Sequence, residues 1–174
     1  MNINYKKLNN ISGWIIGAIA LVVYALTVER VASYWDCGEF ISASYKLQVP
    51  HPPGAPLFLL IGRIFALFSG ESLAVVMEGG ASDKIGLAVN MVSVVSSALT
   101  ILFLFWTITM LARKIIKPNP TTGEYDLGQM IAILGSGAVG ALAYTFSDSF
   151  WFSAVEAEVY AMSSLFTAFV FWAM

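Results

Sequence analysis

Two carboxylates stand three residues apart in the segment WDCGE, at Asp36 and Glu39. If residues 36–48 form a helix, this spacing puts both side chains on one face, one turn apart, with Lys46 about two turns further along. The pKa values of paired carboxylates near low-dielectric surroundings can move apart, which suits one of the two for general-base work. The alternative is a solvated helix start in which Asp36 caps the first turn.

The single histidine of the chain, His51, lies in the proline-rich segment PHPPGAP. Proline fixes its own backbone and restricts the residue before it, so we expect His51, between Pro50 and Pro52, to be extended and rigid. That rigidity suits a binding residue, whereas the alternative is a stiff connector between two helices. Pro56 fits the first position of a following helix. Because the chain has no second histidine and one cysteine, Cys37, the sequence predicts no metal site.

Charged residues inside or beside apolar segments form a third group of candidates. An arginine in an apolar helix is costly unless it snorkels or pairs, and its planar guanidinium also matches a phosphate. Arg63, in LFLLIGRIFALF, and Arg30 are therefore candidates either to bind a phosphate or to reach lipid headgroups, and Glu29 is an alternative partner for Arg30. Glu158 lies at the start of the last apolar run, as a site residue or as the partner in an interhelical hydrogen bond.

The composition indicates which elements must position these side chains. Of the 174 residues, 58% are hydrophobic and 11% are charged, against about 45–50% and about 25% in ordinary soluble domains. A membrane-spanning helix needs about 20 mostly apolar residues. Four runs qualify, at residues 11–28, 85–112, 127–146 and 157–174. We therefore predict an all-α, polytopic membrane protein with about four spans, and expect it to be the N-terminal part of a longer chain.

Basic residues set the predicted orientation in the membrane. They precede the first span and follow the second (Lys6, Lys7, Arg113, Lys114 and Lys117). By the positive-inside rule the N-terminus is cytoplasmic, and residues 29–84 and 147–156 are exoplasmic. The apolar stretch 57–68 is too short to span, so we expect an interfacial helix within a long exoplasmic first loop. With a net charge of -2 and no basic patch, nucleic acid is not an expected partner.

Four motifs, in this order and spacing, resemble a known membrane family. They are WDCGE at 35–39, HPPGAPL at 51–57, NMVS at 90–93, and FW followed by EVY between 150 and 160. Over nearly its whole length the chain resembles the family catalogued as domain of unknown function 2723 (DUF2723). That family is similar to the transmembrane protein O-mannosyltransferases of the C-type glycosyltransferase superfamily.

The resemblance implies a membrane glycosyltransferase. Such an enzyme would move a sugar, mannose among the candidates, from a polyprenyl-phosphate-linked donor to a hydroxyl of an exported protein or glycan, with membrane lipid as a further partner and no cofactor. The resemblance places the catalytic base on Asp36, with Glu39 as the other candidate, in an exoplasmic loop of what we expect to be a bacterial inner membrane protein. The expected substrate-binding residues, of which the first three could offset charge on the leaving phosphate, are His51, Arg63, Arg30, Glu158, Trp151 and Tyr160.

Two other classes of function stay open at the level of sequence. Arg63 and Glu158, with short interrupted apolar segments, also resemble the broken helices and ion sites of a transporter, although no inverted repeat is visible. The chain could instead be a non-catalytic subunit of an envelope assembly, in which Asp36 and His51 would be structural.

Overall fold

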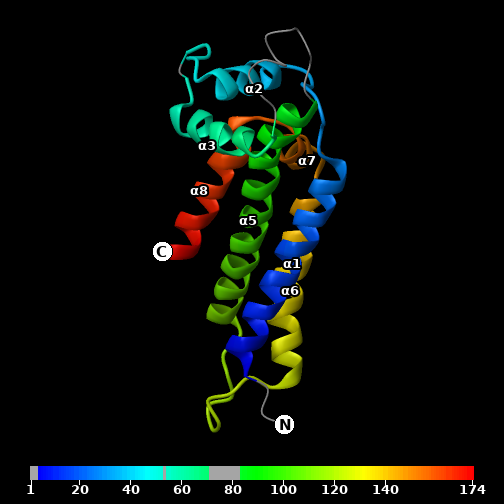
Figure 1. The fold of residues 1–174 in the computed structure, drawn as a ribbon. Coiled ribbons are helices and arrows are strands. Elements are labelled where there is room, and N and C mark those ends of the chain that lie inside the picture. Colours follow the sequence, from blue (N-terminus) through cyan, green and yellow to red (C-terminus); the bar gives the residue numbers. More distant parts are fainter. Residues whose placement is uncertain (1–3, 53, 71–82) are drawn as a thin grey trace.

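The computed structural model of the chain describes residues 4–52, 54–70 and 83–174, and within these ranges every regular element is a helix (Figure 1). This confirms the predicted all-α class. Pro53 and residues 71–82 of the predicted first loop lie outside the described residues. The helices are α1 (Tyr5–Thr27), α2 (Cys37–Lys46), α3 (Pro56–Leu67), α5 (Asp83–Ile115), α6 (Leu127–Thr145), α7 (Asp148–Val155) and α8 (Val159–Ala173).

Three of these helices, α1, α5 and α6, are long and apolar enough to cross a membrane. They correspond to the first three predicted spans, although α1 already begins at Tyr5 rather than at residue 11. The fourth predicted span differs from the expectation, because α7 and α8 reach a spanning length only as a pair that is bent by 112°. The backbone is extended at Glu156 and at Glu158, which interrupts the helix where the apolar run begins.

Helix α5 is the centre of the bundle and packs against α1, α6 and α8, and also against α2, α3 and α7. Glycines allow close approach at these contacts. A Cβ atom on Gly137 of α6 would lie 2.6 Å from Cγ2 of Thr109, and one on Gly17 of α1 would lie 3.3 Å from Cβ of Leu102. Small residues are typical of helix contacts in membranes, where close packing supplies much of the association energy.

The two ends of the bundle carry different segments (Figure 1). The start of α1 and the connection between α5 and α6 lie at one end, where the Arg113 guanidinium lies over the rings of Tyr5 and Tyr125, at 5.1 and 5.9 Å from their centroids. At the other end lie α2, α3 and α7. The described part of the first loop and the acidic segment before α8 therefore share one end of the molecule.

Helices α2 and α3 form a small platform against the end of α5. The expected short apolar helix is present, and it begins with Pro56 at its first position, as predicted. The rings of Phe40 on α2 and Phe58 on α3 pack edge to face at 5.5 Å. Gly62 faces Ser44 so closely that a Cβ atom would lie 2.5 Å from its hydroxyl oxygen.

Candidate active site

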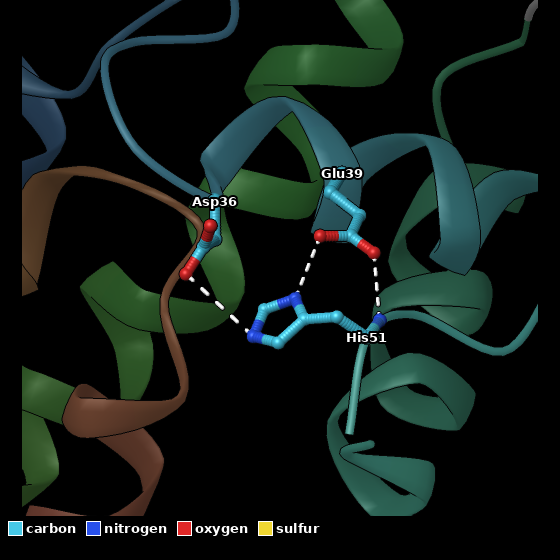
Figure 2. Close-up of polar contacts among 3 residues, drawn as sticks. All are labelled: Asp36, Glu39 and His51. Carbon is cyan, nitrogen blue, oxygen red and sulfur yellow. Dashed lines mark hydrogen bonds and ion pairs between the residues drawn. The ribbon is translucent and has the colours of Figure 1, made fainter. Parts of the chain in front are cut away.

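Three side chains meet at the start of α2, and we call Asp36, Glu39 and His51 the carboxylate–histidine trio (Figure 2). Nδ1 of His51 lies 2.8 Å from Oε2 of Glu39, and the His51 backbone N–H donates to Oε1 at 2.7 Å. Nε2 on the other side of the ring faces Oδ2 of Asp36 at 3.8 Å. The imidazole therefore lies between the two carboxylates, and all three side chains are about half exposed.

A tight turn after α2 brings the histidine back to the carboxylates. Leu47 adopts the left-handed conformation (φ 51°, ψ 48°), and the Gln48 N–H donates to the carbonyl of Ala43 at 3.0 Å. This is the longer of the two hydrogen bonds of a Schellman turn, and together with the left-handed Leu47 it reverses the chain at the helix end. The reversal and the following prolines place His51 beside the first turn of α2, where Glu39 lies.

The hydrogen bonds between His51 and Glu39 shift the pKa values of these two groups in opposite directions. Donation from the His51 ring and then from its backbone N–H lowers the pKa of Glu39 below its usual value of 4.5. The hydrogen bond with Glu39 and the charge of that carboxylate raise the pKa of His51 above 6.5, with smaller contributions from Asp36 and Glu158. Because an ionised carboxylate only accepts hydrogen bonds, Nδ1 is the donor and Nε2 is the nitrogen that can exchange a proton.

Asp36 occupies the N-cap position of α2 but makes no capping hydrogen bond with its side chain. The capping hydrogen bond that the alternative interpretation expects of Asp36 is therefore absent, while its side chain is solvated as that interpretation expects. The reason is the backbone conformation, since Asp36 is near the helical region (φ −85°, ψ −2°) rather than in the extended region of a capping residue. Its carboxylate remains available to the site.

Glu158 approaches the trio from the far end of the sequence. Its side chain is buried and interacts electrostatically with Asp36, Glu156 and His51. The backbone N–H and C=O of Glu158 both pair with the hydroxyl of Ser93 on α5, at 3.4 Å. The expected interhelical contact of Glu158 therefore exists, but it runs through the backbone and leaves the carboxylate near the trio.

The other four predicted binding residues occupy separate places, and Trp151 packs edge to face on the ring of Tyr24 at 5.7 Å. Arg63 is half-buried, donates from Nη1 to the carbonyl of Tyr45 at 2.5 Å and lies over its ring at 5.2 Å, so it is tied to the last turn of α2. Arg30 is exposed, and no ion pair joins it to Glu29 within the described ranges. Tyr160 is exposed in the first turn of α8. None of these four residues forms a described hydrogen bond with the trio.

Sequence reasoning assigned no role to Asn90, which fixes the loop that carries Asp36. Its side-chain amide donates to the carbonyl of Glu29 at 2.7 Å, and Sγ of Cys37 lies 3.6 Å from its Oδ1. Asn90 and Ser93 are both fully buried on α5, one turn apart, and hold the two segments that converge on the trio. A polar pair three residues apart in an apolar run was the signal that could have revealed this role.

The trio also presents a set of cation ligands. One ligand atom from each of Asp36, Glu39 and His51 lies within 4.8 Å of the others. Carboxylate oxygens and an imidazole nitrogen are the types of donor that divalent cations accept in proteins. The Nδ1–Glu39 hydrogen bond already uses one of these donors, so a cation would be coordinated on the Nε2 and Asp36 side.

The trio and the segments that hold it lie within the region matched by a protein family. The family described as "Protein O-mannosyl-transferase TMEM260 N-terminal domain" matches residues 36–174. The chain belongs to this family. The TMEM260 N-terminal domain match therefore includes the trio, α5 with Asn90 and Ser93, and the break between α7 and α8.

Curated relatives agree with this assignment. The chain is 25% identical over 148 residues to the protein O-mannosyl-transferase tmem260 of Dictyostelium discoideum, which covers 84% of the chain and 14% of that protein. It is 28% identical over 163 residues to the mouse protein O-mannosyl-transferase TMEM260, covering 89% of the chain and 18% of that protein. The chain thus spans less than a fifth of the length of these relatives. No solved structure matches it significantly.

Proposed function

We propose that the chain is the N-terminal part of a membrane glycosyltransferase that moves mannose from a polyprenyl-phosphate-linked donor to a hydroxyl of an exported protein or glycan. The observation that carries this proposal is the uncapped carboxylate of Asp36 beside Nε2 of a histidine that Glu39 orients. Membership of the TMEM260 N-terminal domain family and relatives named as protein O-mannosyl-transferases support the reaction class.

In this reaction Asp36 is the general base. The acceptor oxygen forms a bond to C1 of the sugar while the bond from C1 to the phosphate oxygen breaks. The acceptor proton goes to Asp36, and the polyprenyl phosphate leaves with the electron pair of the broken bond. General-base assistance of this kind contributes about 10²- to 10⁴-fold to a rate.

His51 offsets the charge that develops on the leaving phosphate. Its hydrogen bond with Glu39 favours the imidazolium form, and a preorganised positive group near a developing anion stabilises the transition state. Glu39 is a positioning residue, because it acts through the ring that it orients. Arg63 was a competing candidate for the phosphate, but its contacts with Tyr45 favour a structural role for it.

The test is the substitution Asp36→Asn in the full-length protein, assayed as transfer of radiolabelled mannose from polyprenyl-phosphate mannose to an acceptor peptide in membranes. We expect transfer to fall by about 10²- to 10⁴-fold. Glu124→Gln, an exposed change at the opposite end of the bundle, is the control and should leave transfer unchanged. Unchanged transfer in a folded Asp36→Asn protein would exclude Asp36 as the base.

A second candidate function is transport, which the 112° break between α7 and α8 favours. Buried Glu158 lies at this break, and interrupted helices with a charged group at the interruption form ion sites in transporters. Solute uptake into proteoliposomes distinguishes the two functions. If Glu158→Gln abolishes uptake while sugar transfer is absent from the wild-type protein, the transporter assignment replaces the glycosyltransferase.

A further inference from the structure

A cavity of about 890 Å³ lies between the loop after α1 and helix α7, at the same end of the bundle as the trio. Its lining includes four aromatic residues (Tyr34, Trp35, Trp151 and Phe152) and three acidic residues (Glu29, Asp148 and Glu156). We call it the acidic cavity. Its volume falls in the range of about 300–1,000 Å³ that is typical of ligand sites in proteins.

The two walls of the acidic cavity are joined to each other. The Glu29 N–H donates to the carbonyl of Val155 at 2.9 Å, and the Ser33 hydroxyl donates to Oε2 of Glu156. The amide of Asn90 holds the carbonyl of Glu29 from the side of α5. These contacts come from the loop after α1, from α5 and from the end of α7, so the cavity is built by tertiary structure rather than by one loop alone.

The charge of the lining decides which kind of ligand the cavity accepts. Three carboxylates and no lysine or arginine line it among the described residues. Such a lining repels a phosphate and attracts N–H donors and cationic side chains. The aromatic faces add apolar contact and can receive a cation over the ring. The lipid-phosphate donor is therefore a poor match, and a neutral or basic peptide segment is a good one.

Trp35, which lines the cavity, has an unusual backbone conformation. Its side chain is 91% exposed, and its backbone lies in the left-handed region with φ at 60°. Bulky residues rarely adopt this conformation, which costs free energy and is concentrated at functional sites. The conformation puts a large aromatic ring on the surface of the cavity at the residue immediately before Asp36.

Two chain segments lead from the lining of the cavity to the trio and to Glu158. The loop passes from Ser33 and Trp35 in the cavity to Asp36 in the trio, and the other segment passes from Glu156 in the cavity to Glu158, which interacts with Asp36 and His51. A group bound in the cavity therefore lies against segments that lead directly to Asp36 and Glu158, and no cationic side chain lines the cavity among the described residues.

We propose that the acidic cavity binds the acceptor, as a peptide segment that carries a serine or threonine hydroxyl among neutral or basic side chains. This inference rests on the proposed function and states where the acceptor of that reaction binds. The attacking hydroxyl must meet C1 of the sugar close to the base and away from the leaving phosphate. The acidic cavity suits both conditions, because its lining residue Trp35 directly precedes Asp36 and its carboxylates repel the phosphate.

A binding experiment tests the inference without requiring transfer. A photoreactive phenylalanine analogue replaces Phe152, which lines the cavity and is 61% exposed, in the full-length protein. We expect it to crosslink a synthetic threonine peptide with lysines about tenfold more efficiently than the same peptide with glutamates, which corresponds to about 1.4 kcal/mol of selectivity. The same analogue at Leu26, exposed on α1 outside the cavity lining, should not crosslink either peptide.

A kinetic experiment then separates acceptor from donor. In Glu156→Gln and in Trp35→Asn, whose new side chain tolerates the positive φ, we expect the KM for the peptide to rise about tenfold while the KM for the donor stays unchanged. Crosslinking that a short isoprenyl phosphate blocks, or variants that alter only the donor KM, would overturn the acceptor assignment. If the peptide crosslinks selectively but Asp36→Asn still transfers sugar, the cavity assignment holds and the proposed mechanism fails.

Discussion

Asp36 and Glu39 look equivalent in the sequence, but their surroundings give them different chemistry. Both oxygens of Glu39 accept hydrogen bonds from His51, which lowers the pKa of Glu39 and makes it a weak base. Asp36 makes no capping bond and faces Nε2 of the same ring at 3.8 Å. The choice between the two candidate bases therefore favours Asp36.

The pKa of His51 offers the first test at the scale of single residues. Because His51 is the only histidine of the 174-residue chain, its ring gives one signal in an NMR titration of histidine-labelled protein. We expect Glu39→Gln to lower the pKa of His51, since the variant removes the charged partner of Nδ1. Asp36→Asn should lower it less, because Asp36 is 3.8 Å from the ring and contributes less. An equal or larger effect of Asp36→Asn would contradict the assigned order of contacts.

The same pair predicts how the loop responds to pH. Because the pKa of His51 is raised, protonated His51 stabilises the folded loop fully below pH 6.5, and this stabilisation is lost as the pH rises through the folded-state pKa. Because the pKa of Glu39 is lowered, ionised Glu39 stabilises the folded loop fully above pH 4.5, and this stabilisation is lost as the pH falls through the folded-state pKa. We therefore expect amide exchange of His51 to be slowest between about pH 4.5 and 6.5 after correction for the intrinsic exchange rate. Glu39→Gln should abolish this maximum.

At the scale of elements, α5 is both a membrane span and the anchor of the site. Asn90 is fully buried, and its amide fixes the loop that leads to Asp36. We expect Asn90→Ala to cost about 1–3 kcal/mol, because the part-buried carbonyls of Glu29 and Val31 and the buried Cys37 thiol lose their partner. Cys37 is 0% exposed, so its reaction with a maleimide reports opening of this loop and should accelerate in the variant.

The control for this labelling experiment lies on the same helix. Ser97 is fully buried, and its hydroxyl has no hydrogen-bond partner among the described residues. Ser97→Ala should therefore leave the reactivity of Cys37 unchanged. Helix content measured by circular dichroism must stay constant in both variants, since general unfolding would also expose Cys37. Unchanged labelling in a folded Asn90→Ala protein would show that Asn90 does not hold the loop.

Two glycines of α6 give a matched test of helix packing. Gly137 faces α5 so closely that a Cβ atom would lie 2.6 Å from Thr109, whereas nothing lies within 4 Å of a Cβ atom on Gly135. We expect Gly137→Ala to destabilise the protein by about 1–3 kcal/mol through overpacking. Gly135→Ala should be neutral or stabilising by up to about 1 kcal/mol, because alanine favours the helix. Denaturant unfolding in micelles measures both, and equal stabilities would contradict the close α5–α6 contact.

The sequence predicted these elements well where hydrophobic length and proline decide the structure. The three long spans and the helix that begins at Pro56 follow from such local signals. The meeting of His51 with Glu39 could not be predicted, because it depends on a left-handed turn at Leu47, where glycine would be the usual signal. The extended break before Glu158 was also missed, since an apolar run does not show where its hydrogen bonds are interrupted.

At the scale of the whole molecule, the two ends of the bundle carry different functional features. The end that carries the start of α1 and the α5–α6 connection has the basic residues of the positive-inside prediction (Lys6, Lys7, Arg113, Lys114 and Lys117). The opposite end carries the trio and the acidic cavity. From the basic residues at the first end, the positive-inside rule predicts that the site lies outside the cytoplasm, while four further basic residues (Arg30, Lys46, Arg63 and Lys84) belong to segments at the opposite end.

Cysteine labelling in intact cells tests this orientation. In full-length protein with its native cysteines replaced, Val49→Cys, which is 90% exposed beside the trio, should react with an impermeant thiol reagent added outside. Thr122→Cys, exposed in the connection between α5 and α6, should react only after permeabilisation. The reverse pattern would move the site to the cytoplasm and remove the case for an exported acceptor. Because the trio geometry does not depend on the orientation, that result would leave the proposal that Asp36 is the base intact and change only the compartment in which donor and acceptor meet it.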